Sequence, residues 1–339
     1  MKPLVLAAPE PRTLPHLFAP DRLRELHDRY TVLPLTEYDL PRLADDTLAR
    51  ARYLLGQPAL DEGTAARMPS LRAVLNVEGN LLPNLPYDLL LARGVHVLVA
   101  NAVFALPVAE MGLGMALSLL RGIHGADRAM REGRETWGLE SNASARLLSG
   151  STVGILGLGL LGQALARLLQ PFGVRLLAHD PWQAPSVTRA HGAEPVGLDA
   201  VLSEPDTLFV TAAVTGENQG ALGRDRLARL RPGAALILLS RAAVVDFDAL
   251  MDAVEEGRIL AATDVFPEEP LPPDHRARRL PGLLLSAHRA GALASAFHRM
   301  GEMCLEDMDL MDRGLPPQVM RRAERETVGR LRSRPVARS

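Results

Sequence analysis

The sequence has almost no cysteine and almost no lysine, and both scarcities exclude chemistry. Cys304 is its single cysteine, which rules out an internal disulfide, a Cys-x-x-Cys redox motif and a cysteine-based zinc site. We expect Cys304 to be a packed core thiol, and we predict no metal site. Lys2 is the single lysine, which excludes a phosphate-loop lysine and a pyridoxal Schiff-base lysine. Because every other basic residue is arginine or histidine, an arginine alone is weak evidence of a special role.

The chain also lacks an excess of charge. Its formal net charge is −2 over 339 residues, which gives no general attraction to nucleic acid or to an acidic membrane. We recognise no apolar run of the roughly 20 residues that a membrane helix needs. The apolar stretch in the opening MKPLVLAAPEP is too short for the hydrophobic region of a secretory signal. We therefore expect a cytoplasmic location, with no membrane partner and no nucleic-acid partner.

The length favours two domains, since single hydrophobic cores rarely grow beyond about 250–300 residues. Over the first hundred residues, β-like runs alternate with helical ones, which indicates a parallel sheet covered by helices. The predicted strands of this part are 3–8, 51–56, 71–78 and 96–100. From Ser151 the alternation restarts with six apolar β-like runs, the number in a complete doubly wound dinucleotide-binding domain.

The predicted domain boundaries lie where each of the two strand–helix alternations ends. A helix after residue 291 could return to the first domain, so we predict a substrate domain from 1–104 and 291–315 and an NAD-binding domain from 105–290. Segment 107–122 is apolar almost all round and is expected to be buried between domains or between subunits. Residues 316–339 are rich in arginine and predict an exposed tail. A nucleic-acid arm is the less favoured interpretation of this tail.

Three glycines, Gly157, Gly159 and Gly162, form a G-x-G-x-x-G pattern after an apolar strand and before a helical segment. That context favours a dinucleotide-binding turn over an ordinary strand–turn–helix, because a pyrophosphate must approach the backbone at the positive end of a helix. A side chain at Gly159 would block this approach. We expect Leu160 and Leu161, at the start of the helix, to contact the cofactor as well.

The strand after the glycine turn ends at Asp180, 18 residues beyond Gly162. A carboxylate at this place can accept both ribose hydroxyls of NAD and would repel the 2′-phosphate of NADP. The next residues, Pro181 and Trp182, carry no positive charge that could bind this phosphate. We therefore predict NAD as the cofactor.

Three later strands of the same domain each lead to a polar residue, namely Arg241, Glu269 and His288. Ligands of an open α/β sheet bind outside the carboxyl ends of its strands, so we expect these side chains at one crevice. A carboxylate stabilises an imidazolium and fixes its tautomer, and a guanidinium can grip a substrate carboxylate with two hydrogen bonds. The set suits hydride transfer at a carbinol carbon. The alternatives are a structural histidine, a solvated arginine and a solubilising acidic loop.

Several further segments occur in one order along residues 70–300: VAE at 108–110, REGRETWG, LLSGSTVGILGLGLLG, HDPW, VTGENQG, RPGAALILLSRAAVVDFDAL, AATDVFPEEPLPPDH and LLLSAHRAG. In these the chain resembles the D-isomer-specific 2-hydroxyacid dehydrogenase family, which includes phosphoglycerate, D-lactate and glyoxylate/hydroxypyruvate enzymes. The resemblance implies two Rossmann-like domains, with the NAD-binding domain inserted into a discontinuous flavodoxin-like substrate domain. It further implies an NAD(H)-dependent enzyme for a small D-2-hydroxy acid and its 2-oxo acid, and a homodimer through the 107–122 region.

The resemblance also assigns roles to residues. Arg241 would grip the substrate and polarise its carbonyl, and Glu269 would orient the acid–base His288. Asp264 takes the place that contacts the nicotinamide carboxamide, and Glu268 is a spectator. The remaining cofactor contacts, beside those of Arg241 and His288, would be Ala213, Thr215 and Ser240. Besides Arg241 and His288, the implied substrate-binding residues form a loop with backbone N–H groups for the substrate carboxylate: Glu78, Gly79 and Asn80.

Three departures from the family pattern bear on the substrate. Ala242 stands where glycine usually follows the catalytic arginine, Thr211-Ala-Ala213 replaces a His-x-Pro-like run, and Asn76-Val-Glu-Gly-Asn80 replaces a glycine-rich loop. An acid at Glu78 would oppose a bound anion unless it points away. A second class of function stays open, an NAD(H)-sensing co-repressor-like binding protein of the same fold, which would bind NADH with little turnover.

Overall fold

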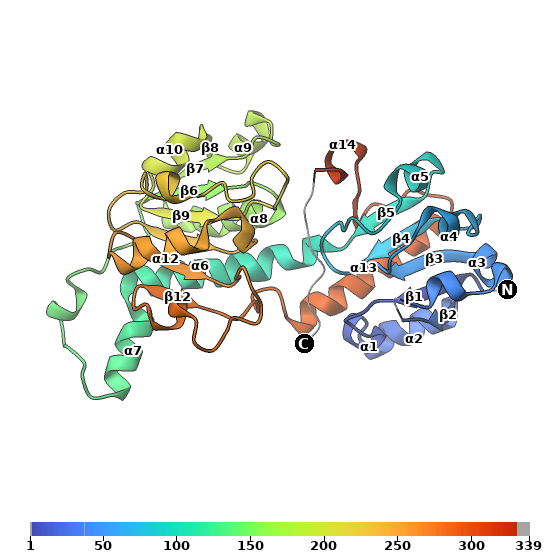
Figure 1. Cartoon of the computed structure of the whole chain (residues 1–339), viewed down its shortest axis with the longest axis horizontal. Helices are drawn as coiled ribbons and strands as arrows, with labels where there is room; N and C mark the ends of the chain where they lie inside the picture. Colours follow the sequence, from blue (N-terminus) through green and yellow to red (C-terminus); the bar gives the residue numbers. More distant parts are fainter. Residues whose placement is uncertain (1, 37, 331–339) are drawn as a thin grey trace. The chain divides into compact units, whose positions relative to one another are not determined.

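The computed structural model describes residues 2–36 and 38–330, which form two compact units (Figure 1). Unit 1 contains the residues up to Phe104 and those from Ala292 onward, and unit 2 is Ala105–Gly291. Each unit has one sheet with a hydrophobic core on either face. The predicted fold class, two α/β units of Rossmann type, is confirmed.

The sheet of unit 1 has the strand order β13-β5-β4-β3-β1-β2. Its strands are β1 (Leu4–Ala8), β2 (Thr31–Pro34), β3 (Ala51–Gly56), β4 (Ala73–Asn76), β5 (His96–Val99) and β13 (Arg321–Arg322). All neighbours are parallel except β13, which is antiparallel to β5. The order 2-1-3-4-5 of the first five strands is the flavodoxin-like order, in agreement with the predicted type of substrate domain.

Helices cover both faces of this sheet. The core on one face includes residues of α1 (Leu14–Leu17), α2 (Pro20–Arg29) and α13 (Ala294–Asp312). The core on the other face includes residues of α3 (Asp45–Arg50), α4 (Glu62–Ala66) and α5 (Tyr87–Ala92). Helix α13 lies close to α1 because Gly301 has no side chain, since a Cβ there would lie 2.3 Å from the carbonyl oxygen of Leu17.

The predicted exposed tail from residue 316 is only partly exposed over residues 316–330, where Pro317, Met320 and Ala323 are buried. Asp307, a buried residue of α13, accepts hydrogen bonds from the N–H groups of residues 318–320 at 2.7–2.9 Å. The chain then adds β13 to the edge of the sheet and continues into α14 (Arg325–Val328). The prediction rested on the arginine-rich composition of the segment. The buried carboxylate that anchors the segment lies on a different element, α13, and left no local signal in the sequence. Residues 331–339 of the predicted tail lie outside the described residues.

The sheet of unit 2 has seven parallel strands in the order β12-β11-β10-β9-β6-β7-β8. They are β6 (Thr152–Leu156), β7 (Arg175–His179), β8 (Glu194–Pro195), β9 (Thr207–Val210), β10 (Ala235–Leu238), β11 (Leu260–Thr263) and β12 (Leu283–Leu285). All six predicted strands are present, and β8 was missed because it has only two residues. The order runs outward in both directions from β6 and β9, so the ligand crevice of a doubly wound sheet lies at their carboxyl ends.

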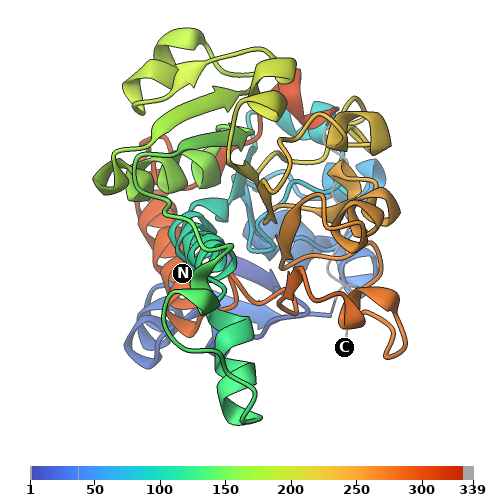
Figure 2. The same ribbon diagram turned by 90° about the vertical axis from the view of Figure 1, so that its left-hand side faces the viewer.

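Helices of unit 2 also lie on both faces. The core on one face contains residues of α6 (Ala105–Arg121) and α8 (Leu160–Leu169). The core on the other contains residues of α10 (Leu198–Ser203), α11 (Arg224–Leu227) and α12 (Phe247–Glu255). The short α9 (Pro185–Ala190) precedes β8, whereas α7 (Ile123–Arg131) and the loop after it extend away from the sheet (Figure 1, Figure 2).

The helical segment Asn101–Arg121 is long and apolar enough to cross a membrane, judged by length and composition only. This finding corrects the expectation that no apolar run reaches such a length. In the fold, α6 packs against α8 and β10, as the core helix of a folded domain does. Gly112 allows this packing, because a Cβ there would lie 2.3 Å from a methyl carbon of Leu239. The predicted burial therefore holds for one face of α6, while Leu106 is exposed.

Candidate active site

The glycine turn joins β6 to α8 at the centre of the unit 2 sheet. Gly157 has φ +96°, and a Cβ there would lie 2.5 Å from backbone atoms of Ala212, beyond the end of β9. A Cβ on Gly162 would lie 2.3 Å from the carbonyl oxygen of Gly157. The Thr211 hydroxyl donates to the same Gly157 oxygen at 2.5 Å. Two of the three glycines are therefore required by the fold itself, because the turn packs against β9 and α8.

Gly159 differs from the other two glycines. A Cβ there would have no described atom within 4 Å, so the backbone at the start of α8 borders open space. Gly159 is the N-cap of this ten-residue helix, and among the described residues no side chain caps the N–H groups at its start. Leu160 and Leu161, the first two residues of the helix, are only partly buried or exposed. Open space, unsatisfied donors and the positive end of the helix dipole fit a dinucleotide pyrophosphate.

Asp180 lies directly after β7, next to this turn. Its Oδ2 accepts a hydrogen bond from the Leu158 N–H at 2.7 Å, and its Oδ1 accepts one from the Trp182 N–H at 2.8 Å. The carboxylate is thus fixed beside the glycine turn, and each oxygen keeps a second lone pair. This is the position from which a carboxylate can accept the ribose hydroxyls of a dinucleotide.

The other predicted cofactor residues border the same edge of the sheet. The Asn218 amide organises the loop after β9, because it donates to the Ala213 carbonyl at 2.7 Å and accepts from the Thr215 N–H at 2.8 Å. Ser240 follows β10, and its Oγ is buried without a hydrogen-bond partner in the part of the chain that the structure describes. A buried orphan hydroxyl of this kind is expected where a ligand or water completes the site. These residues fit a nicotinamide dinucleotide.

The acid–base pair forms beyond β11 and β12. His288 Nδ1 lies 2.6 Å from Glu269 Oε2, and Glu269 Oε1 accepts the Phe266 N–H at 2.9 Å. Burial raises the pKa of Glu269, but the hydrogen bonds from His288 and Phe266 and the charges of His288 and Arg241 outweigh it and hold the pKa below its usual value. Because Glu269 is a carboxylate, Nδ1 of His288 carries a hydrogen and Nε2 is left to exchange a proton.

The backbone at His288 is unusual. His288 has φ +46°, the one positive φ among the non-glycine residues that the structure describes. Its N–H donates to the Asp264 carbonyl at 2.8 Å. Asp264 itself is 1% exposed, and its carboxylate accepts hydrogen bonds from the N–H groups of Arg289 and Ala290 at 3.0 and 2.9 Å. Three hydrogen bonds therefore hold a conformation that costs about 1–2 kcal/mol. This anchoring by Asp264 was not predicted, and its contact with the nicotinamide stays a prediction.

Arg241 follows β10 with an extended backbone and donates from Nη1 to the Ser240 carbonyl at 2.6 Å. Its charge helps to lower the pKa of Glu269, so the two groups are within electrostatic reach. The structure thus brings Arg241, Glu269 and His288 to the carboxyl ends of three adjacent strands. Glu268 is exposed, and no hydrogen bond or ion pair involves it within the described ranges.

The predicted substrate loop lies in unit 1, after β4. The buried Asn76 closes it, accepting the Glu78 N–H at 2.8 Å and donating to the Asn80 carbonyl at 2.7 Å. Gly79 has φ +85°, and a Cβ there would lie 2.6 Å from the Phe104 ring. Because the Glu78 N–H is already bonded, the N–H groups left without an acceptor among residues 2–36 and 38–330 include those of Gly79 and Asn80. These two donors can hold an anion.

The Glu78 carboxylate is paired rather than exposed to solvent. Its Oε1 lies 3.1 Å from Arg12 Nη1, and the Glu78 side chain is 3% exposed. The same Arg12 nitrogen donates to the Val77 carbonyl at 2.9 Å. Arg12 was missed from the sequence, where its place just after the first strand is a weak signal in a chain with many arginines.

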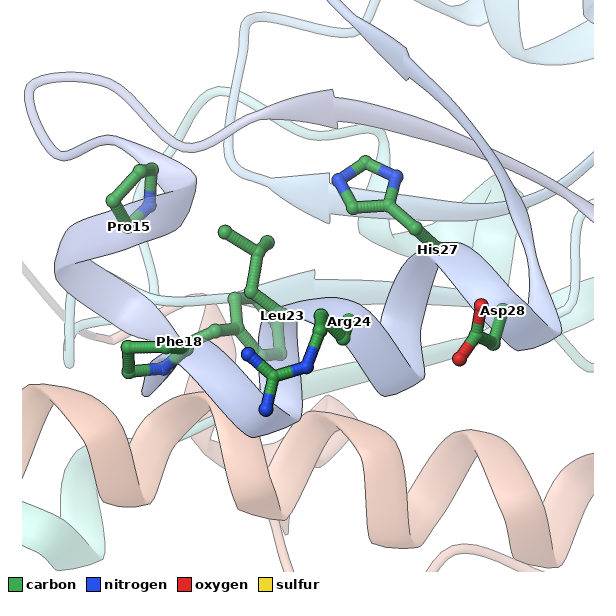
Figure 3. Close-up of a pocket in the computed structure, with 7 residues that line it drawn as sticks. Pro15, Phe18, Leu23, Arg24, His27 and Asp28 are labelled. Carbon is green, nitrogen blue, oxygen red and sulfur yellow. The ribbon is translucent and has the colours of Figure 1, made fainter.

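A separate surface cavity of about 410 Å³ lies over α1 and α2 of unit 1 (Figure 3). Its lining includes Pro15, Phe18, Leu23, Arg24, His27 and Asp28. None of these residues belongs to the glycine turn, the histidine–glutamate pair or the loop after β4. We assign the chemistry to those elements and not to this cavity.

Fold and site together define a nicotinamide-dependent oxidoreductase, and comparison with known proteins gives its family. The family model described as "D-isomer specific 2-hydroxyacid dehydrogenase, NAD binding domain" matches residues 113–290. A glyoxylate reductase of Aeropyrum pernix is 30% identical over 315 residues, which cover 89% of this chain and 93% of that protein. The chain belongs to the D-isomer-specific 2-hydroxyacid dehydrogenase family, which confirms the predicted resemblance.

Solved structures agree. A phosphoglycerate oxidoreductase from Rhizobium etli is 55% identical, with a TM-score of 0.89 over 96% of this chain and 100% of that one. An NADPH-dependent glyoxylate/hydroxypyruvate reductase from Sinorhizobium meliloti, solved with citrate, is 26% identical, with a TM-score of 0.75 over 98% and 100% of the two chains. The protein is accordingly an oxidoreductase of 2-hydroxy acids with NAD(P) as its cofactor.

Proposed function

We propose that the protein interconverts a D-2-hydroxy acid and its 2-oxo acid with NAD(H), and that His288 is the acid–base residue. The observation that carries this proposal is the 2.6 Å contact between His288 Nδ1 and Glu269 Oε2, in the same unit as a glycine turn open to a pyrophosphate. An imidazole backed by a carboxylate can give a proton to, or take one from, the oxygen of the reacting carbon.

Bound NADH supplies the hydride for C2 of the 2-oxo acid. Protonated His288 donates from Nε2 to the carbonyl oxygen, while Glu269 keeps the ring oriented and stabilises its positive charge. Arg241 stabilises the negative charge that develops on that oxygen and binds the substrate carboxylate. In oxidation, neutral His288 accepts the proton from the hydroxyl group.

NAD, rather than NADP, is the cofactor that Asp180 supports. Its carboxylate is fixed beside the glycine turn by two backbone hydrogen bonds and cannot easily turn away from a 2′-phosphate. The Sinorhizobium meliloti reductase is described as NADPH-dependent, so the family similarity alone does not decide this preference. The negative charge at position 180 supports NAD.

The direct experiment follows NADH absorbance with glyoxylate, hydroxypyruvate, pyruvate, a phosphorylated 3-carbon 2-oxo acid and longer 2-oxo acids. Turnover with at least one of them, and a lower kcat/KM with NADPH, is expected. Tight NADH binding without turnover of any 2-oxo acid would contradict the proposal and would favour the NADH-sensing binding protein.

We also propose a homodimer, with the contact surface on α7 and the loop that follows. The large apolar side chains of this part are exposed, among them Trp137 at 74% and Leu139 at 88%. Both views draw this segment extending away from its own sheet (Figure 1, Figure 2). The sequence predicted the dimer contact in segment 107–122, most of which belongs to α6. One face of α6 instead packs inside unit 2. A second copy of the chain is a self-complementary partner for such a surface.

A further inference from the structure

The turn that follows β11 is closed by a single hydroxyl group. Strand β11 ends at Thr263, whose Oγ1 donates to the Val265 carbonyl at 2.6 Å and accepts the Val265 N–H at 3.1 Å. Thr263 and Val265 are both buried, so these backbone groups need hydrogen-bond partners inside the protein. A threonine that binds the backbone two residues further along the chain favours a turn over a continuing strand.

The segment that carries His288 is attached to this turn through four N–H groups. The Ser286 N–H donates to the Thr263 carbonyl at 3.0 Å, and the His288 N–H donates to the Asp264 carbonyl at 2.8 Å. The carboxylate of Asp264 accepts the N–H groups of residues 289 and 290. Because Asp264 lies between Thr263 and the closed end of the turn, the positive φ of His288 is held from this turn.

The other member of the acid–base pair is held from the same turn. Phe266 directly follows Val265, and its N–H donates to Glu269 Oε1 at 2.9 Å. The second oxygen of Glu269 lies 2.6 Å from His288 Nδ1. A shift of the turn would therefore move both the imidazole and the carboxylate that orients it.

We propose that Thr263 is a positioning residue for the acid–base pair. Its hydroxyl group fixes the turn from which Asp264 holds the backbone of His288. The same turn places the N–H group that orients Glu269. Thr263 is buried and acts through these residues, so it is not itself a catalytic residue. The inference rests on the proposed function in one respect, namely that His288 moves the proton of the reaction.

Substitutions of Thr263 separate the role of its hydroxyl from that of its methyl group. Thr263→Val keeps the volume and removes both hydrogen bonds, so kcat is expected to fall about 10–100-fold, as for a small misplacement of a catalytic group. The Kd for NADH should stay within about 3-fold of wild type, because the glycine turn is unchanged. Thr263→Ser keeps the hydroxyl group and should keep kcat within about 3-fold of wild type. A role in packing alone predicts the reverse order, since serine leaves a cavity and valine does not.

Thr207→Val is the matched control for this series. Thr207 and Thr263 are both 0% exposed and lie in the same sheet. The Thr207 hydroxyl, however, has no hydrogen-bond partner among the described residues. Its removal therefore breaks no hydrogen bond, and kcat and the Kd for NADH should both match wild type.

A double variant tests whether Thr263 acts through His288. In His288→Asn the group that moves the proton is already absent, so adding Thr263→Val should lower kcat by less than about 3-fold more. A further loss as large as that caused by Thr263→Val in wild type would overturn the inference, because the hydroxyl would then act elsewhere.

Hydrogen exchange of residues 286–291, followed by mass spectrometry, tests the same contacts without turnover. This segment should exchange faster in Thr263→Val than in wild type, and at the wild-type rate in Thr207→Val. If wild type turns over no 2-oxo acid but this order is found, the proposed function fails and the hold of Thr263 on the segment stands. Unchanged exchange in Thr263→Val overturns the inference. If Thr263→Val does not fold, Thr263→Ser decides: a kcat within about 3-fold of wild type supports the inference, and a lower one contradicts it.

Discussion

His288 and Asp180 are both held in place by hydrogen bonds to and from backbone groups, although they serve different partners. For His288 these bonds hold the residue at φ +46° and run through Asp264. For Asp180 they come from the N–H groups of Leu158 and Trp182. A side chain that is fixed before its ligand arrives loses little conformational entropy on binding. Substitutions at such positions should therefore act on specificity and rate more than on folding.

For Asp180 this argument predicts that a substitution changes the preference for NADH over NADPH. Asp180→Ala removes the charge that opposes the 2′-phosphate of NADP, together with the acceptor for the ribose hydroxyls. The ratio of kcat/KM for NADH over NADPH is expected to fall about 10-fold or more, which corresponds to about 1.4 kcal/mol. Steady-state kinetics with both reduced cofactors measures the ratio. An unchanged ratio would remove Asp180 from the cofactor site.

At the scale of the element, the turn between β6 and α8 separates a folding requirement from a binding requirement. Gly162→Ala places a Cβ 2.3 Å from a backbone oxygen, whereas Gly159→Ala meets no described atom within 4 Å. Gly162→Ala is expected to destabilise the fold by about 1–3 kcal/mol through overpacking. Gly159→Ala is expected to keep wild-type stability and to weaken NADH binding at least about 10-fold, because the added methyl fills the space for the pyrophosphate.

Urea unfolding and NADH fluorescence titration, applied to both variants, test this contrast. Gly197→Ala is a suitable control, since Gly197 is also a helix N-cap and has open space at its Cβ position. Equal losses of stability in Gly159→Ala and Gly162→Ala would contradict the account of the turn.

The edge formed by β5 and β13 predicts a pH dependence of stability. Burial lowers the pKa of His96 below 6.5, the charges of Arg322 and Arg72 lower it further, and Asp307 opposes them. The unfolded chain therefore binds more protons than the fold between the lowered pKa and 6.5, so this contribution to stability is present above 6.5 and is lost as the pH falls through the folded pKa.

His96→Gln removes this titration, and its free energy of unfolding should change less between pH 7.5 and pH 5 than that of wild type. Urea unfolding at several pH values measures the difference between the two slopes. His191→Gln is the control for histidine loss in general, since His191 lies at the end of α9 in unit 2, not at this edge of the unit 1 sheet. If the free energy of unfolding changes with pH equally in wild type and His96→Gln, the titration of His96 does not contribute to the pH dependence of stability.

The elements show what the sequence could predict. Strands such as Leu4–Ala8 and Ala51–Gly56 were predicted because their apolar runs are continuous and buried on both faces. Strands β2 and β8 were missed because edge strands are short and half exposed, so they carry little hydrophobic pattern. The Arg12–Glu78 pair spans 66 positions in the chain, and no local pattern relates residues that far apart. Its discovery needed coordinates, whereas the His288–Glu269 pair followed from strand order.

At the scale of the whole molecule, the exposed apolar segment after α7 predicts assembly. Wild type is expected to have twice the mass of one chain in light scattering at micromolar concentration. Leu139→Asp places a charge in the proposed contact and should give the monomer, because desolvating an unpaired carboxylate in an interface is costly. Leu315→Asp, an exposed leucine of unit 1, is the control and should stay dimeric. A monomeric wild type would contradict the proposed surface.

The measurement that tests the central claim most directly compares turnover and cofactor binding in His288→Asn. Loss of the acid–base group is expected to lower kcat by about 10²–10⁴, while the Kd for NADH stays within about 3-fold of wild type. His191→Asn should match wild type in both quantities. If His288→Asn keeps near-normal turnover of the 2-oxo acid, or loses NADH binding and turnover together, His288 is not the residue that moves the proton.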